Sequence, residues 1–280
     1  GGFVMFKIGD IVARRSYNQD LFLKILDIKK IDGKNIAILG GLNYRLFADA
    51  FVEDLVLKSE KEIVHYQLAD SQEVYKKFRK VVFDRKFKVE EEYFEIPGRI
   101  LHLDGDREYL EQCLRTYKQL GLQAKGICKS EVEQPKVISK ILRENPTDIL
   151  VLTGHDALLK GKKDLKSLDS YRSSAYFVQS VLEARKYQPN KDALVIFAGG
   201  CQSNFEKIIE AGANFASSPK RMLIHALDPV FIVESIAFTP IDRTVSLKDI
   251  IRHTVTGTDG VGGIETRGQM RRGYPKVDYC

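Results

Sequence analysis

Cys201 and His155 are the two side chains whose types and spacing could carry out covalent chemistry. His155 lies in the segment LTGHD (152–156) and Cys201 in AGGCQ (198–202), so each follows a short apolar run and sits beside glycine. A cysteine thiolate attacks carbonyl carbons, and a nearby imidazole accepts and later returns a proton. The pair therefore predicts nucleophilic catalysis, with Cys201 as the nucleophile and His155 as the general base.

The elements around these two residues predict how they are positioned. After Pro97, short apolar segments alternate with amphipathic segments of helical length. The expected strands are 98–103, 122–127, 148–152, 193–198 and 213–216, and the expected helices lie near 107–120, 134–144, 170–187 and 202–211. This alternation indicates an α/β fold with a doubly wound parallel sheet and helices on both faces. Chemistry in such sheets collects beyond the carboxyl ends of the strands, where His155 and Cys201 face each other if their strands are neighbours. A helix starting after Cys201 would favour the thiolate.

The order of the two residues resembles that of the caspase-type (clan CD) cysteine proteases. In those enzymes the histidine follows the third strand and the cysteine the fourth, about 50 residues later; here the interval runs from 155 to 201. One departure is that the family carries glycine directly after the histidine, whereas here Gly154 precedes it and Asp156 follows. We expect the oxyanion hole to use the backbone N–H groups of Cys201 and Asp156.

The residues before the α/β region divide into three parts. Residues 1–4 are interpreted as a cloning remnant. Residues 5–58 contain short runs rich in Ile, Leu and Phe with turn signals about every ten positions, which is typical of a small SH3-like β-barrel. Residues 59–94 are dense in charge, and apolar residues recur at helical spacing, which predicts a charged helical linker. Residues 95–280 then form the predicted protease domain.

Composition excludes several classes of protein. Hydrophobic residues make up 44% of the 280 positions, and Lys plus Arg exceed Asp plus Glu by 44 to 38. No apolar run is long enough to span a membrane, and no secretory signal is visible. The four cysteines form no CxxC pair, which argues against a zinc site or a disulfide framework and favours a reducing compartment. We expect no metal and no cofactor.

Longer blocks resemble a particular family, the YabG family of sporulation-specific proteases. They cover most of the chain and are residues 6–10, 97–106, 152–157, 196–203, 212–219 and 262–268. The resemblance implies a cysteine endopeptidase of sporulating bacteria that cleaves spore-coat and spore-assembly proteins, preferentially after Arg. It further implies action in the mother-cell cytoplasm at the forming spore coat, and the same specificity would permit self-cleavage.

A preference for Arg requires an acidic pocket. A guanidinium that leaves water needs a carboxylate partner, preferably a bidentate one. Four carboxylates are placed near the expected rim: Asp228 and Asp106, which we favour slightly, together with Asp104 and Glu265. Asp104 is also placed to cap the following helix, and Asp156 to orient His155.

Two other functions compete with a protease. A flavodoxin- or receiver-like ligand-binding domain would hold a metal or ligand on Asp104 and Asp106 and leave Cys201 passive, but the Gly-His that ends the third strand argues against it. A nucleic-acid binder would use the barrel and the basic cluster at 76–80. Nucleic acid is the least favoured partner, because basic and aromatic residues are not interleaved as in RNA-binding modules.

Overall fold

The computed structural model describes residues 6–86 and 93–276. The predicted remnant at 1–4 and Cys280 lie outside these ranges. The chain divides into two compact units, residues 1–75 and 76–280.

The first unit contains a five-stranded antiparallel sheet. Its order is β4-β3-β2-β1-β5, with bounds β1 Ile11–Arg14, β2 Leu23–Ile31, β3 Lys34–Gly41, β4 Phe47–Phe51 and β5 Leu55–Leu57. Two 3₁₀ turns, Arg15–Tyr17 and Val52–Asp54, interrupt it. Alternate side chains of the strands form one buried cluster, consisting of Val12, Leu23, Ile25, Ala37, Leu39, Ala50 and Leu55. The predicted β structure of this region is confirmed, while closure into an SH3-like barrel stays a prediction.

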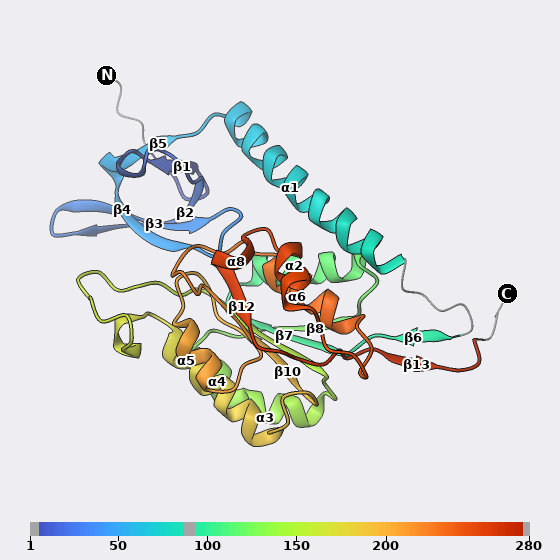
Figure 1. The fold of residues 1–280 in the computed structure, drawn as a ribbon. Helices are drawn as coiled ribbons and strands as arrows, with labels where there is room; N and C mark the ends of the chain where they lie inside the picture. Colours follow the sequence, from blue (N-terminus) through green and yellow to red (C-terminus); the bar gives the residue numbers. More distant parts are fainter. Residues whose placement is uncertain (1–5, 87–92, 277–280) are drawn as a thin grey trace. The chain divides into compact units, whose positions relative to one another are not determined.

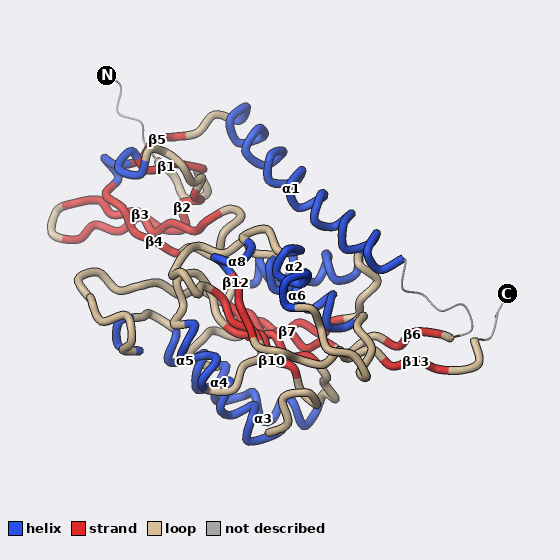
Figure 2. Tube along the Cα trace, in the orientation of Figure 1, coloured by secondary structure: helices blue, strands red, loops and turns tan. Residues whose placement is uncertain are grey.

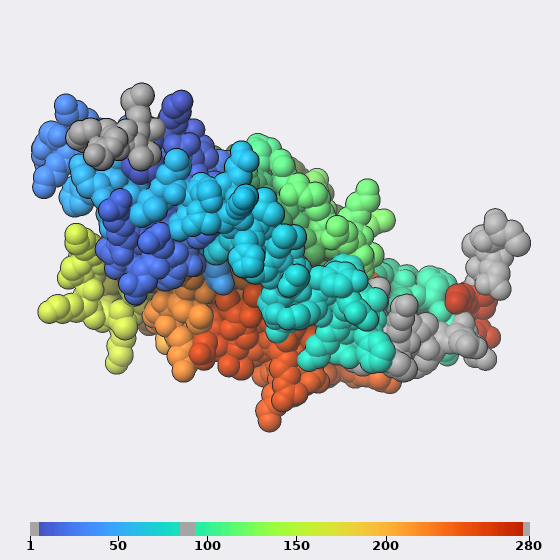
Figure 3. Space-filling model, turned by 90° about the horizontal axis from the view of Figure 1, so that it is seen from above, coloured from blue at the N-terminus to red at the C-terminus, as the bar shows by residue number. Residues whose placement is uncertain are grey.

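Helix α1 (Glu60–Lys86) confirms the predicted helix within the described part of the linker. Ser59 and Glu62 form a capping box: the Glu62 carboxylate accepts from the Ser59 N–H (2.9 Å), and the Glu62 N–H donates to the Ser59 hydroxyl (3.4 Å). The helix keeps an exposed apolar series, which includes Val64, Leu68, Tyr75 and Phe83. Figure 3 shows α1, coloured light blue to cyan, at the surface. Residues 76–86 of α1 belong to the second unit.

The second unit is built on a six-stranded sheet in the order β12-β11-β10-β9-β7-β8 (Figure 1). The strands are β7 Ile100–Asp104, β8 Ala124–Cys128, β9 Ile149–Thr153, β10 Val195–Ala198, β11 Phe215–Ser217 and β12 Val261–Gly263. All neighbours pair in parallel except β12, which runs antiparallel to β11 at the edge. The predicted parallel sheet is confirmed, and each predicted strand lies within two residues of an observed one.

Helices cover both faces of this sheet (Figures 1 and 2). On one face, Leu101, Leu150 and Ile196 pack with side chains of α3 (Gln134–Glu144), α4 (Ser174–Tyr187) and α5 (Phe205–Glu210). The other face is covered by α2 (Arg107–Gln119) and α6 (Asp228–Ala237). Apolar side chains alternate between the faces along each strand, which is why a run of consecutive apolar residues folds as a strand buried on both sides.

Several short elements were not predicted. They are the 3₁₀ turn Leu168–Ser170, α7 Leu247–His253, α8 Gly257–Gly260 and the two-stranded ribbon of β6 (Phe94–Ile96) with β13 (Arg271–Gly273). Strand β12 and helix α6 also lie where no element was predicted. The helix predicted over 202–211 begins only at Phe205, where Asn204 caps it by accepting from the Lys207 N–H at 3.2 Å.

Candidate active site

The register of three adjacent strands fixes what lies beyond their carboxyl ends. Asp104 on β7 pairs with Thr153 on β9, and Leu152 on β9 pairs with Ala198 on β10. Backbone hydrogen bonds continue both pairings for one residue beyond the strands, since Gly105 donates to the Thr153 carbonyl and Gly199 to the Leu152 carbonyl, each at 3.0 Å.

A row of glycines comes next. Continuing the register by one residue aligns Gly105, Gly154 and Gly200. The backbones are close there: a Cβ atom on Gly200 would lie 2.5 Å from the Gly154 carbonyl oxygen and 3.2 Å from the Asp156 nitrogen. A Cβ atom on Gly105 or Gly154 would overlap the carboxylate of Glu131. Only glycine permits this approach of loop to loop and of carboxylate to backbone.

One residue further, the same register aligns Asp106, His155 and Cys201. The three side chains predicted to lie at the rim therefore come from three neighbouring strands and occupy equivalent positions beyond them. The loops that carry the predicted nucleophile and the predicted base therefore leave neighbouring strands and touch at Gly154 and Gly200.

Asp106 is bonded directly to His155. Its Oδ2 lies 2.9 Å from His155 Nε2, and its Oδ1 accepts from the backbone N–H groups of Glu108 (2.8 Å) and Tyr109 (3.2 Å). Burial alone would raise the pKa of Asp106, but the hydrogen bonds from His155 and Tyr109 outweigh it and hold that pKa below its usual value. Asp106 therefore carries a negative charge beside the imidazole while it caps α2.

Glu131 holds the backbone of His155. The His155 N–H donates to Glu131 Oε1 at 2.6 Å, and the ring of Tyr109 lies against the imidazole with centroids 5.8 Å apart. Glu131 was not among the predicted site residues, although it is a half-buried carboxylate at the rim.

The Cys201 side chain is buried against the segment that follows β11. Its Sγ accepts from the Ile224 N–H at 3.4 Å and donates to the Ile224 carbonyl at 3.8 Å. The next residue, Gln202, takes a left-handed conformation (φ 57°) and donates to the Met222 carbonyl at 3.0 Å. The expectation that a helix starts beside the sulfur is wrong: a turn follows Cys201, and α5 begins four residues later.

The Asp156 side chain is a buried structural centre. Its oxygens accept from the Ala157 and Ser173 N–H groups (2.9 and 2.7 Å) and from the hydroxyls of Ser174 and Ser203 (2.5 and 2.8 Å). Burial raises its pKa despite these bonds. The carboxylate ties the loop after β9 to the loop after β10. The carboxylate that contacts the His155 imidazole is that of Asp106, and not that of Asp156 as we expected.

Asp104 lies in a buried polar chain beneath the rim. It accepts from the Thr153 hydroxyl (2.8 Å) and the Asp106 N–H (2.9 Å), while Thr153 also lies 2.7 Å from His102 Nε2. The cap of α2 is Asp106 rather than Asp104.

The other two predicted carboxylates are Asp228 and Glu265. Asp228 is fully buried at the start of α6 and accepts from the N–H groups of His225 (3.1 Å) and Val255 (2.7 Å) and from the Thr256 hydroxyl. Burial raises its pKa. Glu265 is exposed and follows the end of β12. Because β12 is antiparallel to β11, Glu265 lies at the opposite end of the sheet from the rim.

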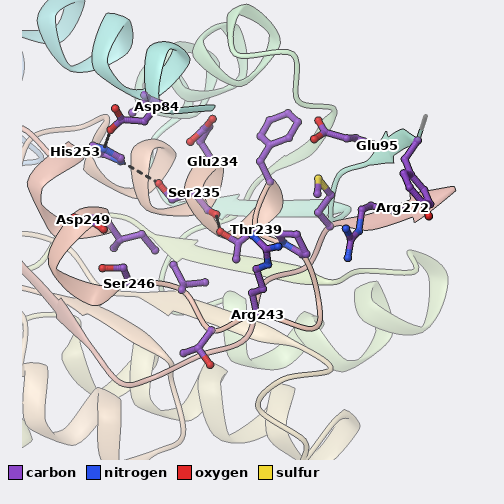
Figure 4. Close-up of a pocket in the computed structure, with 18 residues that line it drawn as sticks. Asp84, Glu95, Glu234, Ser235, Thr239, Arg243, Ser246, Asp249, His253 and Arg272 are labelled. Carbon is purple, nitrogen blue, oxygen red and sulfur yellow. Dashed lines mark hydrogen bonds and ion pairs between the residues drawn. The ribbon is translucent and has the colours of Figure 1, made fainter. Parts of the chain in front are cut away.

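A second group of hydrogen-bonded polar side chains, Asp84, His253 and Ser235, lines a cavity of about 200 Å³ elsewhere in this unit (Figure 4). His253 Nε2 lies 3.0 Å from Asp84 Oδ2, and its Nδ1 lies 3.3 Å from the Ser235 hydroxyl. That hydroxyl also donates to the Phe231 carbonyl at 3.2 Å. Burial lowers the pKa of His253. None of Asp106, His155 and Cys201 lines this cavity.

Within residues 6–86 and 93–276, no group of three or more His, Cys, Asp or Glu side chains is arranged to hold a metal ion. No helix among these residues combines the length and hydropathy needed to cross a bilayer.

Comparison with known proteins decides the family. Residues 7–275 match the model of the YabG peptidase U57 family. The chain belongs to this family. It is 43% identical to the "Sporulation-specific protease YabG" of Bacillus subtilis (strain 168), over 97% of this chain and 99% of that protein. No solved structure matches it. Membership makes this chain a peptidase, and the resemblance read from the sequence blocks is confirmed.

Sequence reasoning missed two parts of this YabG-family site. Glu131 lies in the loop after β8, which is two strands away from β9 in the sheet, and it has no motif around it. The segment 222–224, which covers Cys201, was likewise not singled out. A usable signal was present in the three repeated strand endings, Asp-Gly-Asp, Thr-Gly-His and Gly-Gly-Cys, which share a central glycine and end on the three aligned residues.

Proposed function

We propose that this chain is a cysteine endopeptidase in which Cys201 is the nucleophile and His155 the general base. The observation that carries the proposal is the alignment of the two residues beyond neighbouring parallel strands, with their loops in backbone contact at Gly200 and Gly154. The family is one of peptidases, and a thiol beside an imidazole is a recurrent device for acyl transfer.

The chemistry has two halves. His155 takes the thiol proton, and the Cys201 sulfur forms a bond to the scissile carbonyl carbon, whose π electrons move to the oxygen. The tetrahedral adduct collapses, the C–N bond breaks, and His155 returns the proton to the departing amine. Water, deprotonated by His155, then adds to the thioester carbon, and the sulfur leaves and regains a proton.

The developing oxyanion requires N–H donors. We assign this role to the backbone N–H groups of Asp156 and Cys201. Their positions support this, because the Asp156 nitrogen lies against Gly200, the residue directly before the nucleophile. The side chain of Asp156 fixes that backbone by joining both loops.

A substrate must reach a sulfur that is buried in this structure. The backbone of Ile224 occupies the space beside Sγ, and Met222 holds the adjacent turn through the Gln202 N–H. A peptide bound for attack would replace the Ile224 contacts, so we expect residues 222–224 to shift when substrate binds.

Specificity for Arg is proposed on the family resemblance and needs a carboxylate at the rim. Asp104 and Asp228 are fully buried with their oxygens bonded internally, and Glu265 lies at the other end of the sheet. Asp106 is bonded to His155 and α2. Glu131 is half-buried and accepts one hydrogen bond, through its Oε1 from the His155 N–H, whereas Asp106 uses both of its oxygens, so we assign Glu131 as the carboxylate that meets the guanidinium. Glu131→Gln should then reduce cleavage after Arg far more than cleavage after Gln.

The sheet order and the named relative support the remaining parts of the proposal, which are the fold family, the substrates and the location. Counted from β7, the sheet has the order 2-1-3-4-5 with an antiparallel sixth strand, and this supports a caspase-like domain. The relative's name supports a role in sporulation. We propose spore-coat and spore-assembly proteins as substrates, the mother-cell side of the forming coat as the location, and the chain itself as a further substrate. The SH3-like first unit would serve in assembly or docking.

The decisive experiment is proteolysis by the pure chain and by Cys201→Ala and His155→Ala. Candidate coat proteins and a short Arg-containing peptide serve as substrates. Each replacement should lower kcat/KM by a thousandfold or more, on the order of 4 kcal/mol of transition-state stabilisation. Cys128→Ala, which alters a thiol outside the site, is the matched control. Full activity in a folded Cys201→Ala variant would exclude the cysteine mechanism, whereas a folded wild-type chain that cleaves none of these substrates would favour a ligand-binding role.

A further inference from the structure

We infer that Asp106 is a positioning residue for His155, so that the site works as a Cys-His-Asp triad. The inference rests on the proposed function, since it assigns a third member to the same site. Its basis is the 2.9 Å contact between Asp106 Oδ2 and His155 Nε2, made by two residues that the sheet register aligns.

The contact selects one tautomer of the imidazole. An ionised carboxylate only accepts hydrogen bonds, so Nε2 must carry the proton that it donates to Asp106. Nδ1 is then the unprotonated nitrogen in the neutral ring, and the proposed mechanism assigns the thiol proton to it. When it does, the resulting imidazolium lies beside a negative charge, which stabilises it.

The position of Asp106 is itself fixed by the fold. One oxygen accepts two N–H groups at the start of α2, and its own N–H donates to Asp104 Oδ1 at 2.9 Å. Asp104 is in turn held by Thr153. These bonds prevent the carboxylate from turning away, so the orientation of the imidazole is set before substrate binds.

The backbone of His155 is held independently, through its N–H bond to Glu131. The Tyr109 ring lies near the imidazole, with centroids 5.8 Å apart. Titratable groups around the imidazole include Asp106 at the start of α2, Tyr109 on α2 and Glu131 in the loop after β8, and the register places Cys201 in the neighbouring loop after β10. Asp106 bonds to a ring nitrogen and so fixes which nitrogen carries the proton.

The test uses Asp106→Asn and Asp106→Ser in the full chain. Asn and Ser are both good helix N-caps, so α2 keeps its cap in each variant while the Asp106 carboxylate is lost. Asp148→Asn is the matched control, because Asp148 is also a half-buried carboxylate but pairs with Arg99 at the other end of the sheet. Kinetics on an Arg-containing peptide are combined with NMR of nitrogen-labelled histidines in a Cys201→Ala background, which reports which ring nitrogen carries the proton, with the His155 signal assigned from His155→Gln.

We expect both Asp106 variants to lower kcat at least tenfold with KM nearly unchanged, and to populate the Nδ1–H tautomer of His155 where the wild-type ring carries its proton on Nε2. Asp148→Asn should change neither. Wild-type kcat together with an unchanged His155 tautomer would overturn the inference. A rise in KM alone, with the tautomer unchanged, would also overturn it and make Asp106 a substrate-binding residue. If Cys201→Ala retains activity, the proposed function fails, yet the His155 tautomer still reports on the Asp106 pairing.

Discussion

Asp106 and His155 lie 49 positions apart in the chain, yet a carboxylate oxygen of one is 2.9 Å from an imidazole nitrogen of the other. The same carboxylate caps α2. The first residues beyond the sheet and the start of α2 therefore also orient the imidazole. This arrangement makes the geometry of the site sensitive to small changes in the loops beyond β7, β9 and β10.

Gly200→Ala should impair catalysis while the chain remains folded. Its Cβ would lie 2.5 Å from the Gly154 carbonyl oxygen, a backbone atom that cannot rotate away, so the two loops must separate. A displacement near 1 Å commonly costs about a hundredfold in rate, and the overpacking costs about 1–3 kcal/mol of stability. Peptide kinetics and urea unfolding measure the two effects.

Gly40→Ala is the control for this change. Its Cβ would meet only the side chain of Leu26, at 3.0 Å, which has room to adjust because it is partly exposed. Equal activity in wild type and Gly200→Ala would show that close contact of the two loops is not required for catalysis.

Asp156→Ala should destabilise the fold. Its loss leaves four buried donors, two backbone N–H groups and two serine hydroxyls, without their acceptor. Unpaired buried donors cost about 1–3 kcal/mol each before relaxation, so we expect the free energy of unfolding to fall by roughly 3 kcal/mol or more. Asp164→Ala, in an exposed turn, should change it by less than about 0.5 kcal/mol. Similar urea midpoints for both variants would contradict this role of Asp156.

Most strands and helices of the second unit were predictable because the pattern of apolar residues that identifies each one lies within a short stretch of sequence. Buried parallel strands read as consecutive apolar residues, and the intervening amphipathic helices have the 3.6-residue period, so strands and helices from 98 to 217 were located closely. The positions of His155 and Cys201 after neighbouring strands were predictable for the same reason, since strand ends are visible in the sequence.

The carboxylates could not be assigned in this way. Asp104, Asp106 and Asp156 all lie within three residues of the end of a strand. Their roles differ because they have different hydrogen-bond partners, and these partners come close only in the folded chain. α6 was missed because it is apolar on nearly all sides. Buried on every face, it lacks the amphipathic pattern that identifies a surface helix.

Stability should fall as the pH is lowered from 7.5 to 5, partly through His253. Burial lowers its pKa in the folded state from the ordinary value of 6.5. Below pH 6.5 the unfolded chain therefore binds a proton that the folded chain does not, which favours unfolding until the folded pKa is reached. Above pH 6.5 both states are neutral, and this effect vanishes.

His253→Gln should make the pH dependence shallower, by at most about 1.4 kcal/mol per pH unit. Glutamine retains a polar group toward Asp84 and Ser235. Replacing His65, an exposed residue of α1, with Gln is the control. Identical slopes of unfolding free energy against pH for wild type and His253→Gln would show that His253 does not titrate differently on folding.

A fragment of residues 76–280 should fold and cleave a small peptide, whereas one starting at Tyr93 should be markedly less stable. Both contain every residue of the proposed triad. Only the longer one keeps the last turns of α1, where Val81 is 2% exposed, Asp84 bonds to His253 at 3.0 Å and the Lys77 ammonium donates to the Arg252 carbonyl at 3.2 Å. Burying one valine contributes about 1.5 kcal/mol to the free energy of unfolding. A buried hydrogen bond to a charged group contributes about 1.5 kcal/mol or more, and these partly exposed ones contribute less.

We therefore expect the free energies of unfolding of the two fragments, measured in urea, to differ by roughly 2–4 kcal/mol. Equal stability would place the domain boundary after α1, and a folded but inactive 76–280 fragment would show that the first unit takes part in the chemistry.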